Sequence, residues 1–119
     1  MAFSWLLSLL RDRPPEDSQA IADRIKKGKT RLLGEMGTIR MRLRVAELEA
    51  GKRKMETAGL QDVGEDKRYR NSLELWAMAE IRVEQLEATI DMLQRNVELL
   101  EDAAVGVSIG EAFTGAGNL

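Results

Sequence analysis

The side chains of this 119-residue chain that could do chemistry are almost all carboxylates, ammonium groups and guanidinium groups. The sequence holds no histidine and no cysteine, so it lacks the groups used by most general bases, most metal sites and all His-assisted nucleophiles. One stretch, residues 73–102, concentrates eight carboxylates against two arginines: Glu74, Glu80, Glu84, Glu87, Asp91, Glu98, Glu101 and Asp102. Such a density could indicate a metal site or an acid pair. Without His, Cys or a pocket, we interpret it as a solvated or filament-pairing face, and we expect no enzyme, no metal and no cofactor.

The basic residues are concentrated upstream of the acidic ones. Residues 18–58 hold eleven Lys and Arg against five Asp and Glu, although the whole chain has 18 basic and 20 acidic residues and a formal charge of −2. A basic helix is attracted to an anionic lipid surface by about 1 kcal/mol per basic residue close to it. The alternative is a solvated face. Nucleic acid is not expected as a partner, because no aromatic residue lies between Trp5 and Tyr69 to stack on bases.

Residues 1–15 combine an apolar segment with two arginines and a Pro14-Pro15 stop. Wound as a helix, the segment is about 15–20 Å long, too short to cross a hydrocarbon core of about 30 Å. We predict an amphipathic helix lying in the plane of a membrane. The apolar face that would insert carries Phe3, Leu6, Leu7 and Leu10, and the residues at the head-group level are Trp5, Arg11 and Arg13. The alternative is a helix that docks on the domain or on a neighbouring subunit.

Two heptad repeats predict the helices that position these charges. Apolar residues in alternating steps of three and four form a first seam, meaning the stripe that faces a partner helix: Leu32, Met36, Ile39, Leu43, Ala46 and Ala50. A second seam runs for five heptads: Tyr69, Ser72, Trp76, Ala79, Val83, Leu86, Ile90, Leu93, Val97, Leu100 and Ala104. Two glycines beside an Asp place a tip within 58–65.

A short loop between two heptad helices predicts an antiparallel pair. The expected fold is therefore all-α: an elongated, coiled-coil-like antiparallel hairpin over residues 16–104, with a short amphipathic helix at 1–15. Residues 105–119 are rich in glycine and are expected to start a further helix or to form a tail. Glycines inside the first helix (Gly28, Gly34, Gly37 and Gly51) indicate close approach of another backbone, hinge points or tolerated weakness.

A further set of apolar residues lies outside both seams: Met41, Val45, Leu48, Met55, Leu75 and Met78. Left exposed, they would make a lone hairpin a poor monomer. The first helix is basic and the second is acidic at Glu80, Glu84, Glu87 and Asp91, so the basic edge of one hairpin could lie against the acidic edge of the next. Such a contact is heterologous and can propagate into a filament. The alternative is that these charges pair within one hairpin.

The order of these segments resembles that of the ESCRT-III membrane-remodelling proteins, and most closely the archaeal, cell-division branch. The likeness covers most of residues 18–113, and residues 78–101 with Gly106 resemble the second helix of that family. The resemblance implies a homopolymer, alone or with paralogous subunits, that constricts or cuts an anionic membrane from the cytoplasmic side. It also implies a lipid-facing basic set (Lys26, Lys27, Lys29, Arg40, Arg42 and Arg44) and an inserted wedge (Phe3, Trp5, Leu6 and Leu10).

The later helices and the C-terminal motif that recruits an AAA-type ATPase in ESCRT-III proteins have no counterpart in the 119 residues, so we expect a truncated core or an absence of that recruitment.

Two other classes of protein remain open from the sequence. A phage-shock-type membrane-repair scaffold shares the amphipathic start and the long hairpin, although its heptads are less interrupted by glycine. A soluble coiled-coil adaptor would use residues 1–10 for docking and would have no membrane role.

Overall fold

The structure, a computed structural model, consists of two long α-helices over the residues that it describes. These are residues 18–61 and 66–117, with side chains described as far as residue 110. Helix α2 spans Ser18–Gln61 and helix α3 spans Asp66–Gly117. No proline follows Pro15, so nothing removes a backbone N–H from either helix interior. Helix α2 ends at Gln61, inside the range 58–65 predicted for the tip, and α3 begins at Asp66, directly after that range.

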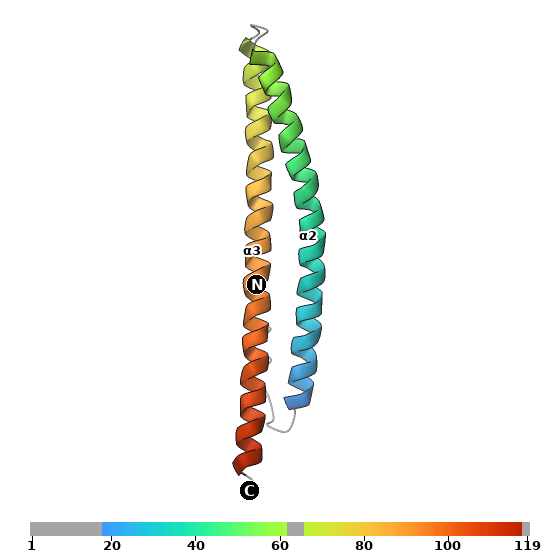
Figure 1. The fold of residues 1–119 in the computed structure, drawn as a ribbon, viewed down its shortest axis with the longest axis vertical. Helices are drawn as coiled ribbons and strands as arrows, with labels where there is room; N and C mark the ends of the chain where they lie inside the picture. Colours follow the sequence, from blue (N-terminus) through green and yellow to red (C-terminus); the bar gives the residue numbers. More distant parts are fainter. Residues whose placement is uncertain (1–17, 62–65, 118–119) are drawn as a thin grey trace. The chain divides into compact units, whose positions relative to one another are not determined.

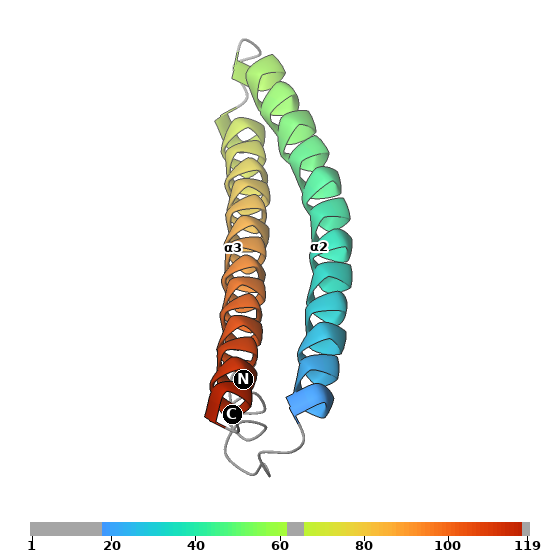
Figure 2. The same ribbon diagram turned by 60° about the horizontal axis from the view of Figure 1, so that its bottom comes forward.

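The two helices pair in opposite directions within each of two compact units. The tip unit combines residues 36–61 of α2 with residues 66–91 of α3, and the terminal unit combines α2 as far as Glu35 with α3 from Met92 onward. In both units the helical segments lie side by side and antiparallel (Figure 1 and Figure 2). The prediction of an all-α antiparallel helical hairpin is confirmed.

The core of the tip unit is built around small side chains. Ala46 and Ala50 of α2 are buried against Val83 of α3, and the partly buried side chains packed against this cluster are those of Leu43, Ala79 and Leu86. All six belong to the two predicted seams. Alanine at the contact lets two helix axes approach more closely than leucine would, because the distance between axes depends on the side chains between them.

The core of the terminal unit contains larger buried side chains than the core of the tip unit. Ile25 of α2 and Leu100 of α3 are buried together, and Ile21, Leu32, Ala103, Ala104 and Val107 pack around them. Val107 lies beyond Ala104, and α3 continues to Gly117 without a break at the boundary that the sequence suggested after residue 104. The glycines of residues 105–117 therefore do not interrupt the helix.

Candidate functional site

The outer face of α2 in the tip unit carries large apolar side chains that are exposed. Met41, Leu48 and Met55 follow one another at seven-residue spacing and are 71%, 76% and 77% exposed, and Val45 beside them is 68% exposed. At 3.6 residues per turn these positions lie opposite Ala46 and Ala50, which face α3. The predicted apolar residues outside the first seam are thus uncovered by any described part of the chain.

Two glycines share this outer face with the apolar residues. A methyl group added at Gly37 or at Gly51 would meet no atom within 4 Å. The close approach of another backbone, one of the three roles predicted for the glycines, is therefore not made at either position by the described residues of this chain. We name the set Gly37, Met41, Val45, Leu48, Gly51 and Met55 the outer face from here on.

Exposed apolar residues also occur on α3 of the tip unit. The predicted residues Leu75 and Met78 are 43% and 66% exposed, and Ile81, which the sequence reasoning did not single out, is 52% exposed. The steps of three from Leu75 to Met78 and from Met78 to Ile81 are a signal that could have identified Ile81 as a neighbour on the helix surface.

An open groove joins the two helices along one side of the tip unit. Its lining comes from Met41, Arg42, Val45, Ala46 and Glu49 of α2 and from Ala79 and Arg82 of α3. The groove therefore continues the outer face towards α3 and carries two guanidinium groups.

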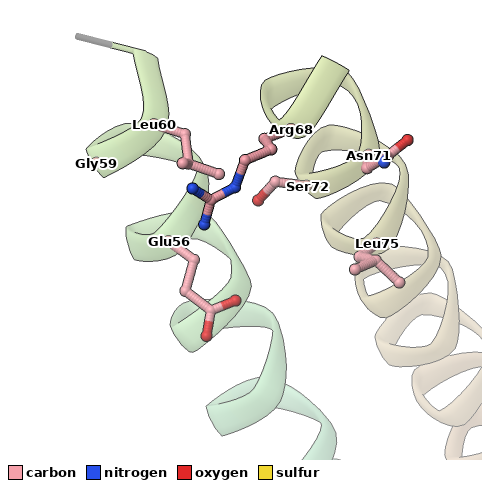
Figure 3. Close-up of a pocket in the computed structure, with 7 residues that line it drawn as sticks. All are labelled: Glu56, Gly59, Leu60, Arg68, Asn71, Ser72 and Leu75. Atoms are coloured by element: carbon pink, nitrogen blue, oxygen red, sulfur yellow. The ribbon is translucent and has the colours of Figure 1, made fainter. Parts of the chain in front are cut away.

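A second open hollow lies where α2 ends and α3 begins. Figure 3 shows the Arg68 side chain reaching from α3 towards α2, where Glu56 and Leu60 lie on the facing side, while Ser72 also points towards α2. Ser72, which lines the hollow, forms a buried hydrogen bond of 2.6 Å between its hydroxyl group and that of Thr57. Thr57 Oγ1 also donates to the Arg53 carbonyl oxygen, so the Ser72 hydroxyl is the donor in this contact between α2 and α3.

The predicted lipid-binding cations differ in their surroundings. Lys29 Nζ lies 3.0 Å from Glu101 Oε1 across the terminal unit, so Lys29 already has an anionic partner. Lys26 and Lys27 are exposed and line a shallow surface with Asp23 and Thr30. Arg40, Arg42 and Arg44 are exposed as well, and four-residue spacing puts Arg40 and Arg44 on one edge of α2 while Arg42 lies on the groove side.

The predicted acidic residues form an edge of α3 rather than a converging site. Glu80, Glu84, Glu87 and Asp91 are all exposed, and the Trp76 indole N–H donates a 3.1 Å hydrogen bond to Glu80. Within residues 18–61 and 66–110, no ion pair joins these carboxylates to Arg40, Arg42 or Arg44. Over the same described ranges, no group of three acidic side chains is arranged to hold a metal ion.

The predicted membrane-inserting residues Phe3, Trp5, Leu6, Leu7 and Leu10 lie outside the described residues, as do Arg11 and Arg13. In the part of the chain that is described, neither helix has a stretch both long and apolar enough to cross a bilayer. No family model matches the chain, and no curated protein and no solved structure shows significant similarity to it.

Proposed function

We propose that this chain is the subunit of a polymer that assembles on anionic membranes and remodels them, in the manner of the ESCRT-III proteins that its sequence resembles. The observation that carries the proposal is the outer face of α2, where four large apolar side chains are between 68% and 77% exposed. A soluble monomer gains nothing from such a face, whereas an assembly buries it.

The charge distribution supports assembly by the same reasoning. Arg40 and Arg44 on α2 and the acidic edge of α3 have no ion-pair partners among the described residues of their own chain. Complementary edges that are left unpaired in one subunit set the register and choice of the next subunit. The proposed location is the inner, cytoplasmic face of the cell membrane, where anionic lipids attract basic helices.

The amphipathic segment predicted at residues 1–15 supplies the proposed membrane anchor. A single short helix binds weakly, but many copies in one array bind collectively, so polymer and membrane reinforce each other. The lipid-facing cations are Lys26, Lys27 and Arg42, because Arg40 and Arg44 belong to the contact between subunits, and Lys29 is available only at the expense of its pair with Glu101.

Electron microscopy of the purified chain with and without anionic liposomes tests the proposal. Filaments, rings or coated tubes are the expected result, and co-sedimentation with the liposomes should decrease as ionic strength rises. Leu6→Asp should abolish co-sedimentation, whereas the matched control Ser8→Asp adds the same charge to the polar edge and should retain most of it. Smooth vesicles and small uniform particles would instead favour the soluble coiled-coil adaptor.

A further inference from the structure

The outer face of α2 carries a repeat of large and small side chains. The large residues Met41, Leu48 and Met55 recur every seven residues, and all three are more than 70% exposed. Small residues lie three or four positions away on the same face, at Gly37, Gly51 and Ala58, and Arg44 occupies the remaining position of that seven-residue row. Seven-residue recurrence of two positions on one face is the pattern by which two helices pack into a coiled coil. This face is separate from the seam that α3 covers, so α2 has two packing faces and only one of them is occupied within the described chain.

We propose that the outer face of α2 packs antiparallel against the outer face of α2 in a second copy of this chain, about a two-fold axis, with Leu48 of each copy opposite Gly51 of the other. The same register places Met41 of each copy opposite Ala58 of the other. Met41 and Leu48 of each copy then each enter the space beside a small side chain of the other. Gly51 can accept Leu48, because a methyl group added at Gly51 would meet no atom within 4 Å in its own chain.

The antiparallel direction follows from the order of these residues. A parallel, in-register pair would place Gly51 against Gly51 and leave a gap, which costs the surrounding side chains their contacts. It would also place the two Arg44 guanidinium groups at one level in the contact, where like charges repel. The antiparallel register separates the two Arg44 residues and brings each one opposite Met55, over which its aliphatic stem can lie while the charged group reaches water.

Charge complementarity identifies the occupant as a second copy. Glu47 and Lys54 lie seven residues apart on one edge of the outer face, both exposed, and neither forms an ion pair within residues 18–61 and 66–110. In an antiparallel pair, each edge faces the same edge of the other helix. Glu47 of one copy therefore lies opposite Lys54 of the other, and the two-fold axis repeats the pair. No other partner is needed to explain this pattern.

The proposed dimer rests on the proposed function only in that both require the outer face to be buried by assembly. It requires neither a lipid nor residues 1–17. An isologous contact closes after two copies. Growth of a filament from such dimers would then use another surface, for which the exposed Leu75 and Met78 on α3 are available. The whole contact lies in the α2 segment of the tip unit, which is continuous helix from residue 36 to Gln61.

Sedimentation analysis of the full chain without lipid tests the dimer. We expect a dimer at about 100 µM, and we expect Glu47→Lys and Lys54→Glu each to weaken it about tenfold, because each change turns two attractive pairs into two repulsive ones. An equimolar mixture of the two variants should recover the affinity, since opposite charges then face each other at both sites. Leu48→Asp should abolish the dimer. The matched control Ile81→Asp changes an exposed apolar residue of α3 and should leave it intact.

Several results would overturn the proposal. A wild-type monomer at that concentration would do so, and so would a dimer that neither charge reversal weakens. Recovery in a mixture of Glu47→Lys with Lys52→Glu, in place of Lys54→Glu, would indicate a parallel pair and would also overturn it. Assemblies larger than a dimer support the proposal only if the two reversals reduce them and their mixture restores them. Circular dichroism verifies that each variant is folded. A wild-type chain that is monomeric but binds liposomes rejects only the proposed dimer. A wild-type dimer that does not bind liposomes rejects the proposed membrane function.

Discussion

The side chains of Thr57 and Ser72 form a buried hydroxyl–hydroxyl hydrogen bond of 2.6 Å between α2 and α3. Thr57 Oγ1 also donates a 2.8 Å hydrogen bond to the Arg53 carbonyl oxygen, so Ser72 is the donor in the contact between the helices. Both residues occupy seam positions, and they are only 3% and 7% exposed. A polar pair in an otherwise apolar seam is satisfied in one register of the two helices and not in neighbouring ones.

Replacing Thr57 should therefore destabilise the hairpin. Thr57→Val keeps the shape of the side chain but leaves the buried Ser72 hydroxyl without its acceptor, which should cost about 1–3 kcal/mol in the free energy of unfolding. Urea unfolding followed by circular dichroism measures this. Thr30→Val is the matched control, because the exposed Thr30 hydroxyl donates only to the Lys26 carbonyl, and its loss should cost less than about 0.5 kcal/mol. Equal costs for the two variants would contradict a role for the Thr57–Ser72 contact.

Adjacent leucines on α3 offer a test of the terminal unit. Leu100 is 2% exposed and packs with Ile25, whereas Leu99 is 43% exposed. Leu100→Ala should lower the free energy of unfolding by about 2–5 kcal/mol, because it removes buried methyl groups and leaves a cavity. Leu99→Ala makes the same chemical change and should cost less than about 1 kcal/mol in the isolated chain. A larger loss of stability from Leu99→Ala than from Leu100→Ala in the lipid-free monomer would contradict the burial of Leu100 against Ile25.

The glycines of α2 predict a stabilising substitution. A methyl group at Gly34 would meet no atom within 4 Å, and Gly34 lies in the helix interior. Gly34→Ala should raise the free energy of unfolding by about 0.5–1 kcal/mol, because alanine loses less backbone entropy on forming a helix. The reverse change Ala88→Gly, at an exposed position of α3, should lower it by a similar amount. Thermal unfolding of both variants gives the comparison, and a destabilising Gly34→Ala would show that something packs on that face.

The ion pair between Lys29 and Glu101 allows the contribution of Lys29 to stability to be tested apart from its contribution to lipid binding. Both side chains are substantially exposed, 40% and 51%, so reversing either charge should cost about 1 kcal/mol or less. The double variant Lys29→Glu with Glu101→Lys should recover that stability. If Lys29 also contacts lipid, the double variant should still bind anionic vesicles less well than the wild type. Lys27→Glu is the control for stability only, since Lys27 is exposed and has no ion pair among the described residues. Its stability should be unchanged.

Periodicity in the sequence determined the secondary structure and the buried faces. Ala46, Ala50 and Val83 were expected in the seams because steps of three and four repeat a helix face at every turn, and this relationship involves only neighbours along the chain. The same local argument predicted that Met41 and Leu48 lie outside the seam, and two glycines beside an Asp placed the tip within residues 58–65. Counting the acidic and basic residues was enough to predict opposite net charges on the two helices.

The tertiary structure alone decided which residues of the two helices meet. Thr57 was not singled out in the sequence, although it lies seven residues after Ala50, and its partner Ser72 follows from the register between α2 and α3. The pairing of Lys29 with Glu101, 72 positions later in the sequence, depends on that register as well, as does the packing of Val107 beyond the expected end of the core. A repeat fixes the direction in which each side chain points along its own helix, but many registers of two repeats are equally apolar. Side-chain volumes and polar pairs distant in the sequence distinguish among them, and these act only once the helices are packed.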